Sequence, residues 1–221
     1  MRLLVKLAAA EAFQSVPWSL SRAAYTNVSF SVAAQSGTPG DVAFKTDGTK
    51  MYVLDNGGSV FQYSLSTAWN LSTASYDSVS FSVATEELAP QALAFKSDGT
   101  KMYVMGTAED KVFQYSLSTA WDLSTASYDS VSFSVTSEDA APTGLAFKSD
   151  GTKMYVMGSA NDTVYQYSLS TAWNLSTASY DSVSFSVATQ ESGPKGLAFK
   201  SNGTRMYLVG TISDTIYQYS L

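Results

Sequence analysis

The sequence contains no cysteine and no histidine. Without cysteine there are no disulfides, thiolate metal sites or thiol nucleophiles. Without histidine the chain loses the commonest general base and the commonest metal ligand. On composition alone we therefore expect no enzyme, no catalytic residues, no cofactor and no metal site.

The chain is also short of positive charge and of long apolar runs. Lys and Arg number 13 against 19 Asp and Glu, which gives a net charge of −6. Nucleic-acid binding needs clustered Lys and Arg in excess, so this class of partner is not expected. No run approaches the roughly 18 apolar residues that a membrane-spanning helix needs.

An internal repeat dominates what is present. The stretch FKSDGTKMYV at 95–104 recurs unchanged at 147–156 and with small changes at 44–53 and 199–208. The four tryptophans follow the same period, at intervals of 51 or 52 residues. A period near 50 residues is typical of a propeller or a solenoid.

Each repeat contains four strand-like segments. In the third copy, PTGLAFK and TKMYVMG flank the turn SDG, which is hairpin chemistry. TVYQYSL and DSVSFSV then alternate apolar and polar residues with the period of a strand. We therefore predict an all-β fold: a four-bladed β-propeller of four-stranded antiparallel blades.

The two chain ends are complementary. The last repeat stops after its third strand, whereas residues 16–32 align with the connection and outer strand at 67–83. We expect residues 26–33 to pair with 215–221 and close the last blade, so that 16–221 forms the propeller. A strand swap between chains and an eight-bladed ring of two chains remain alternatives.

Residues 1–15 are predicted to form a short helical segment, with a secretory signal as the alternative.

The repeat resembles that of the YVTN and lactonase-like propellers. The run PTGLAFKSDGTKMYV at 142–156 is similar to their P-x-G-[ILV]-A-[FV], D-G and Y-V pattern. The resemblance implies a propeller fold and an occurrence in cell-surface, surface-layer and phage-type proteins. In enzymatic members it implies a central metal held by carboxylates and an Asn, and no residue of this sequence is matched to that site.

Two sets of repeated positions carry polar or aromatic side chains that could form sites. Asp47, Asp98, Asp150 and Asn202 precede turn glycines and are interpreted as turn caps. Tryptophans in the Ser/Thr-rich connections are candidates for stacking on a sugar or for filling the space between blades. These are Trp18, Trp69, Trp121 and Trp173.

The predicted loops segregate by charge. On the face with the strand 4–1 and 2–3 connections, eleven acidic residues stand against two basic ones. Its candidate contacts are Glu86, Glu87, Glu109, Asp110, Glu138, Asp139, Asp162, Glu191 and Asp214, and Asp41, Asp55, Lys111 and Lys195 lie there too. The opposite face has the candidate basic contacts Lys50, Lys101, Lys153 and Arg205. Opposite charges on two faces favour head-to-tail self-association.

Five Asn residues fit the N-glycosylation acceptor pattern: Asn27, Asn70, Asn161, Asn174 and Asn202. Together with the resemblance they predict an extracellular or virion-surface location.

Three functions were compared on these grounds. The favoured prediction is a non-enzymatic structural or assembly protein of an exterior surface, joined to further copies into an oligomer or filament. The alternative is a lectin-like adhesion module that binds glycans between its blades, with avidity from repetition. An enzyme is the least favoured.

Overall fold

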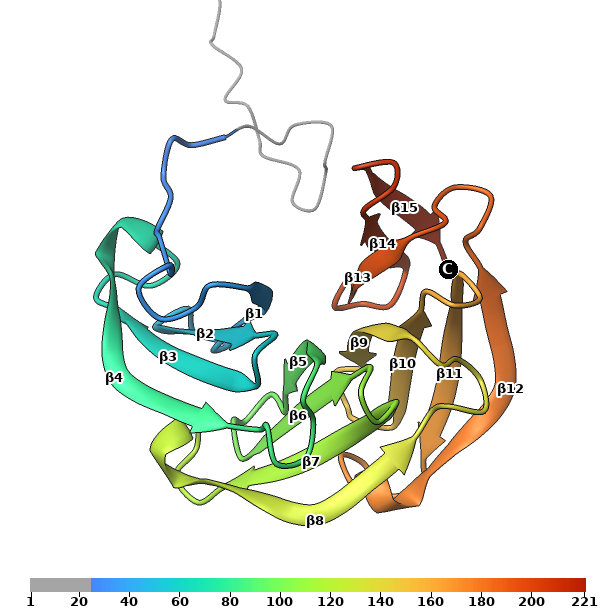
Figure 1. Cartoon of the computed structure of the whole chain (residues 1–221), viewed down its shortest axis with the longest axis horizontal. Coiled ribbons are helices and arrows are strands. Elements are labelled where there is room, and N and C mark those ends of the chain that lie inside the picture. The colour runs from blue at the N-terminus through green and yellow to red at the C-terminus, as the bar shows by residue number, and fades with distance from the viewer. Residues whose placement is uncertain (1–24) are drawn as a thin grey trace, which may run out of the picture.

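The computed structural model describes residues 25–221, and the helix expected at 1–15 lies outside these residues. Four antiparallel sheets stand around a common centre in an open ring (Figure 1). The predicted all-β, four-bladed propeller is confirmed. No helix of the described residues is long and apolar enough to cross a membrane.

Each blade runs outward from the centre in chain order. The strands of blade 1 are β1 (Pro39–Phe44), β2 (Lys50–Asp55), β3 (Ser59–Leu65) and β4 (Ala74–Ser82). Those of blade 2 are β5 (Pro90–Phe95), β6 (Lys101–Gly106), β7 (Lys111–Leu117) and β8 (Ala126–Ser134). Those of blade 3 are β9 (Pro142–Phe147), β10 (Lys153–Gly158), β11 (Thr163–Leu169) and β12 (Ala178–Ser186). Blade 4 contains β13 (Pro194–Phe199), β14 (Arg205–Gly210) and β15 (Ile216–Ser220). Short 3₁₀ turns at Leu71–Thr73, Leu123–Thr125 and Leu175–Thr177 precede the outer strands.

The repeated D-G turn makes the inner hairpins. Gly99 has a φ of 75°, a left-handed conformation that glycine adopts without steric cost. Asp98 Oδ1 accepts hydrogen bonds from the Thr100 amide (3.0 Å) and hydroxyl (2.7 Å). The carboxylate therefore caps its own turn, as the sequence indicates.

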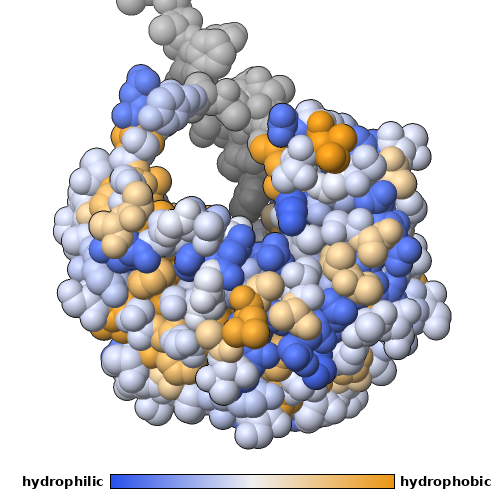
Figure 2. Space-filling model, in the orientation of Figure 1, coloured by the Kyte–Doolittle hydropathy of each residue, from blue (hydrophilic) through white to orange (hydrophobic). Residues whose placement is uncertain are grey.

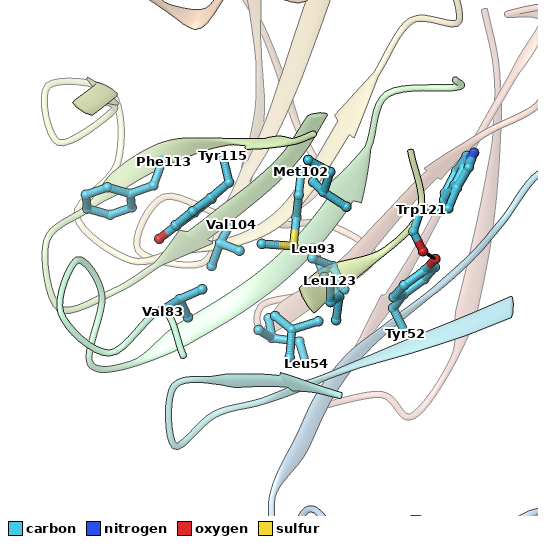
Figure 3. Packing of buried hydrophobic residues seen from close by; sticks show 12 residues of the cluster. Tyr52, Leu54, Val83, Leu93, Met102, Val104, Phe113, Tyr115, Trp121 and Leu123 are labelled. Carbon is cyan, nitrogen blue, oxygen red and sulfur yellow. Dashed lines mark hydrogen bonds between the residues drawn. The ribbon is translucent and has the colours of Figure 1, made fainter. Parts of the chain in front are cut away.

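The core lies between neighbouring blades. Figure 3 shows Tyr52 of β2 beside Trp121, which follows β7 in the next blade, with Leu54 and Leu123 of the same cluster to their left. The Tyr52 hydroxyl donates to the Trp121 carbonyl oxygen at 2.6 Å. Because the Tyr103 hydroxyl makes the same bond to Trp173 at 2.6 Å, one interface is copied from blade to blade.

Blade 4 differs from the prediction. Its sheet contains three strands, and within the described residues the 26–33 segment forms no ladder with β15. Residues 25–36 pack against blade 1 instead, where Phe30 meets Tyr63 edge-on at 5.6 Å. The ring is open between blades 1 and 4 (Figure 1).

Candidate functional site

The first strand of every blade carries a β-bulge at the same place. In blade 1, Pro39 and Asp41 pair with consecutive residues of β2, so Gly40 is the extra, unpaired residue. The same register shift leaves Gln91, Thr143 and Lys195 unpaired in blades 2, 3 and 4. A bulge bends its strand and redirects the side chain at that position, and bulges are common beside active sites.

These four bulge residues differ although the blades around them are almost identical. Blade by blade they are a glycine, an amide, a hydroxyl and an ammonium group. They meet at a central cavity of about 350 Å³, which is also lined by Asp41, Asn56 and Thr211. Figure 2 shows hydrophilic residues around the central hollow of the ring. The centre of the ring is therefore chemically asymmetric, although the strands that form it repeat.

Asp41 is the carboxylate of this cavity. Its Oδ1 accepts from the Val42 amide and its Oδ2 from the Leu93 amide of blade 2, both at 2.8 Å. Burial raises the pKa of Asp41 from 3.8 to about 6, and the two amide donors only partly oppose this rise. Each carboxylate oxygen keeps a second lone pair for another partner. A carboxyl with a pKa near 6 exchanges protons near neutral pH, as a general base requires.

The other polar groups of the cavity surround Asp41. Lys195 is exposed on β13, while Thr143 is buried and donates from its hydroxyl to the Pro194 carbonyl oxygen at 2.9 Å. Asn56 follows β2, and its buried Oδ1 has no hydrogen-bond partner among the described residues. A Cβ on Gly40 would lie 1.9 Å from that oxygen, so the glycine leaves room for the Asn56 amide.

The donor set does not fit a metal ion. Asp41 is the one carboxylate among the cavity-lining residues, and Lys195 places a positive charge in the same cavity. Nowhere in residues 25–221 do three His, Cys, Asp or Glu side chains gather in a way that would hold a metal ion. Hard cations are held mainly by carboxylates, and the single carboxylate of this cavity is offset by the charge of Lys195.

Several residues predicted as acidic-face contacts are buried instead. Glu87, Asp139 and Glu191 are at most 2% exposed. Glu87 accepts from the amides of Ala89 (2.9 Å), Ala108 (2.9 Å) and Glu109 (3.2 Å), and Asp139 and Glu191 bind their own loops in the same way. The prediction of an acidic contact face is wrong for these three residues, because their charge is used to hold the 2–3 and 4–1 loops together.

We expect Glu87→Gln to lower the free energy of unfolding by about 2 to 3 kcal/mol, because an amide NH₂ then faces a buried backbone N–H. Glu109→Gln is the matched control, since Glu109 is exposed and pairs only with Lys111 (3.0 Å). The control should change stability by less than about 0.5 kcal/mol. Urea unfolding of both variants measures the difference. Equal effects would show that the hydrogen bonds of the buried Glu87 carboxylate do not stabilise the fold.

The remaining acidic candidates are partly engaged. Glu86 and Glu138 accept hydrogen bonds from the hydroxyls of Tyr115 (3.4 Å) and Tyr167 (3.1 Å). Burial, followed by the charges of Glu87 and Asp139, raises the pKa of Asp110. Asp110 and Asp162 each have one buried carboxylate oxygen that finds no partner in residues 25–221, and Asp214 is exposed.

The predicted basic contacts are held inside their own blades. Lys50, Lys101 and Lys153 form ion pairs of 2.9, 2.7 and 2.7 Å with Asp77, Asp129 and Asp181 of the outer strands. Arg205 of blade 4 donates to Ser220 at 2.9 Å. Three of the four predicted contacts thus stabilise strand pairing, which leaves little free charge for a partner.

The tryptophans lie at the blade interfaces. Trp121 is 7% exposed, Trp173 is half-buried and Trp69 is 60% exposed beside the opening of the ring. All three have positive φ near 63°. Trp18 lies outside the described residues.

The sequon asparagines lie in turns and connections. Asn27, Asn70, Asn161 and Asn202 are exposed and Asn174 is half-buried. Asn70 and Asn174 cap their 3₁₀ turns by accepting from the amides of Ser72 and Ser176. Asn161 donates to the Glu138 carbonyl oxygen at 3.0 Å.

Sequence reasoning missed the central cavity. Asp41 and Lys195 were counted as loop charges, and Gln91, Thr143 and Asn56 were not considered. The available signal was the position after the repeated proline, which changes from Gly to Gln, Thr and Lys, although the strand around it, Asp41 apart, is apolar in every copy.

No family model matches the chain, and no curated protein matches it. Several solved structures are similar to the chain. A Bacteroides uniformis protein assigned as a 6-phosphogluconolactonase superposes with a TM-score of 0.57 at 15% identity, covering 83% of this chain and 53% of that one. The periplasmic gluconolactonase of Pseudomonas aeruginosa gives 0.54 at 16%, covering 82% and 49%. The propeller domain of Myceliophteria thermophila Cps50 gives 0.53 at 12%, covering 81% and 52%.

At these identities the likeness is one of fold. The chain spans about half the length of the structures it matches. The chain thus shares its fold with lactonase-like propellers, as the sequence resemblance implies. No comparison shows a match to the YVTN repeats.

The functional prediction from sequence requires correction. It favoured a structural, filament-forming protein of a cell or virion surface, with a lectin as the alternative and an enzyme as the least favoured function. The similar structures include proteins named as lactonases, which contradicts the expectation of no enzyme and lends no support to filament, virion or adhesion roles. The absence of His and Cys does not by itself exclude catalysis, because a carboxyl with a raised pKa can also serve as an acid or base.

Proposed function

We propose that this protein is a hydrolase that opens a small, polar lactone in its central cavity, with Asp41 as the general base. The observation that carries the proposal is the cavity itself. In it the four repeated blades place a glycine, an amide, a hydroxyl and an ammonium group around a carboxyl whose pKa is about 6. Its volume of about 350 Å³ falls in the usual range of small-molecule sites, roughly 300 to 1,000 Å³.

The chemistry follows from these groups. The Asp41 carboxylate takes a proton from a water molecule as that water adds to the lactone carbonyl carbon. The carbonyl oxygen becomes an oxyanion, which the Lys195 ammonium stabilises. The carbon–oxygen bond of the ring then breaks, Asp41 returns the proton to the departing ring oxygen, and a hydroxy acid is released.

The polar groups around Asp41 provide binding rather than chemistry. The amides of Gln91 and Asn56 and the hydroxyl of Thr211 offer donors and acceptors for substrate hydroxyl groups. The free Oδ1 of Asn56 gains a donor when such a hydroxyl binds. The lactonase names of the similar structures, and the YVTN-like and lactonase-like repeat, support the choice of a lactone. The extracellular location remains a proposal that rests on the same resemblance.

The test is proton release from D-glucono-1,5-lactone in a pH-stat, corrected for spontaneous hydrolysis. Lys195→Met should lower kcat by about 10- to 100-fold because the oxyanion loses its charged partner. Lys148→Met is the matched control, since Lys148 is exposed on a turn and pairs with Asp150 (2.7 Å). A wild-type rate no higher than that of buffer, or equal losses in both variants, would overturn the proposal.

A further inference from the structure

Blade 4 has a groove at its inner hairpin turn. The groove encloses about 250 Å³ and is lined by Phe147, Tyr155, Phe199, Gly203, Leu221 and polar residues of two turns. It lies at the interface of blades 3 and 4. The other three blades show what belongs at this position.

In blades 1 to 3 a tryptophan covers the turn glycine. A Cβ built on Gly48, Gly99 or Gly151 would lie 2.3 Å from the indole of Trp69, Trp121 or Trp173. Each tryptophan amide also donates to that glycine's carbonyl oxygen at 2.9 to 3.0 Å. Gly203 has the same backbone, with φ at 72°, but no described atom lies within 4 Å of its built Cβ.

The aromatic neighbours of the missing indole are already in place. Tyr103 and Phe147 lie 4.5 Å apart and Trp173 completes their cluster, 5.3 Å from Phe147. Tyr155 and Phe199 lie 4.4 Å apart in the same arrangement, and no described residue adds a third ring to them. Within the described residues the Tyr155 hydroxyl makes no hydrogen bond like that of Tyr103 to the Trp173 carbonyl. The groove therefore has the shape and the aromatic neighbours of the tryptophan sites in blades 1 to 3.

The segment that follows Trp18 is already shaped as an outer strand. Asn27 has a φ of 59°, the value found at Ser78, Ser130 and Ser182 in the complete blades. Phe30 packs on Tyr63 as Phe81 packs on Tyr115, at 5.6 and 5.5 Å, both edge-on. Gln35 accepts from the Tyr63 hydroxyl, the contact that Glu86 makes with Tyr115. By these contacts residues 25–36 are the outer strand and 4–1 loop that precede blade 1.

We propose that Trp18 of the same chain fills this groove over Gly203 and joins the N-terminal segment to blade 4. Trp18 precedes Tyr25 by seven residues and Phe30 by twelve, the spacing of Trp69 to Tyr76 and Phe81. Seven extended residues span about 23 to 25 Å, enough to connect neighbouring blades. In this position the Trp18 amide donates to the Gly203 carbonyl oxygen, and the Trp18 carbonyl accepts from Tyr155.

The docked segment also accounts for exposed apolar surface on blades 3 and 4. Val183, Phe185 and Ile216 are each about half exposed, at 50%, 51% and 57%, near the uncovered edge of β15. With Trp18 in the groove, residues 26–33 lie where a fourth strand would pair with that edge. The inference concerns ring closure and does not depend on the proposed hydrolase activity.

The test uses a spin label and fluorine NMR on the full chain. All tryptophans are replaced by 5-fluorotryptophan, and the Trp18 line is assigned by its loss in Trp18→Phe. Because the chain has no cysteine, Ser201→Cys carries one nitroxide beside the groove. Ser97→Cys places the label on the equivalent turn of blade 2, next to Trp121.

We expect the label at position 201 to broaden the Trp18 line and the label at position 97 to broaden the Trp121 line but not that of Trp18. Absence of Trp18 broadening with the label at 201 would overturn the proposal. Broadening that occurs only when labelled, fluorine-free chains are mixed with fluorinated, label-free chains would also overturn it, because the indole would then come from a second copy.

Discussion

Asp41→Asn is expected to lower kcat for lactone hydrolysis by about 100- to 10,000-fold, the usual range for loss of a general base. The Asn side chain keeps an oxygen that can accept from the Leu93 amide, as Asp41 does at 2.8 Å, so the blade contact survives the change. What is lost is the ability to take a proton from water. In the wild-type protein kcat/KM should rise with pH through about 6, because the base works only when Asp41 is ionised. Any residual kcat/KM of the variant should not show this rise near pH 6.

The stability of the same variant separates chemistry from unfolding. The folded-state pKa of Asp41, about 6, lies above the ordinary 3.8, so folding favours the protonated form. The stabilising contribution of this group is thus present below about pH 4 and is lost as pH rises through 6. Asp41→Asn removes this pH-dependent loss, so the free energy of unfolding of the variant should fall less between pH 4 and pH 8 than that of the wild-type protein. An Asp41→Asn variant that is folded at pH 8 and keeps the wild-type rate would count against a catalytic role.

Trp121→Ala is expected to lower the free energy of unfolding by about 3 to 5 kcal/mol, as large-to-small changes in a core do. The indole is 7% exposed and packs against Phe95 at 5.4 Å and Tyr52 at 6.1 Å, so its removal leaves a cavity between blades 1 and 2. The left-handed backbone of Trp121, with φ at 65°, remains and is left without the packing that holds it.

Guanidinium unfolding at neutral pH measures the effect. Trp173→Ala should give a similar loss because its interface is a copy of the first, whereas Leu88→Ala, at a side chain 72% exposed, should change little. A loss below about 1 kcal/mol for Trp121→Ala would contradict the account of the core as a set of repeated indole contacts.

The fold was predictable because its signals are local and repeated. The D-G turn needs a left-handed glycine such as Gly99 wherever it occurs, and strand alternation is visible within each copy. Four copies at a constant period then fix the number of blades. The closing contact differs in kind, because residues 26–33 and 215–221 are almost the whole chain apart and no local pattern decides whether they pair.

The candidate site was harder to predict for two physical reasons. A polar residue in a loop gives no sign of its burial, so Glu87 looked like a free charge although it holds three backbone amides. The bulge that brings Gln91, Thr143 and Lys195 to the cavity depends on a one-residue register shift between β-strands. Such a shift is set by tertiary pairing, and Asp41 gains its raised pKa only from the burial that this pairing creates.

The most direct test of the central claim is to locate where a product-like ligand binds. Amide nitrogen–proton NMR spectra recorded during titration with D-gluconate report this residue by residue. The account predicts shift changes at Gly40, Asp41, Asn56, Gln91, Thr143 and Lys195, with the tryptophan connections unaffected. Changes confined to the connections or outer strands, or none at saturating gluconate, would contradict a functional site at the centre of the ring.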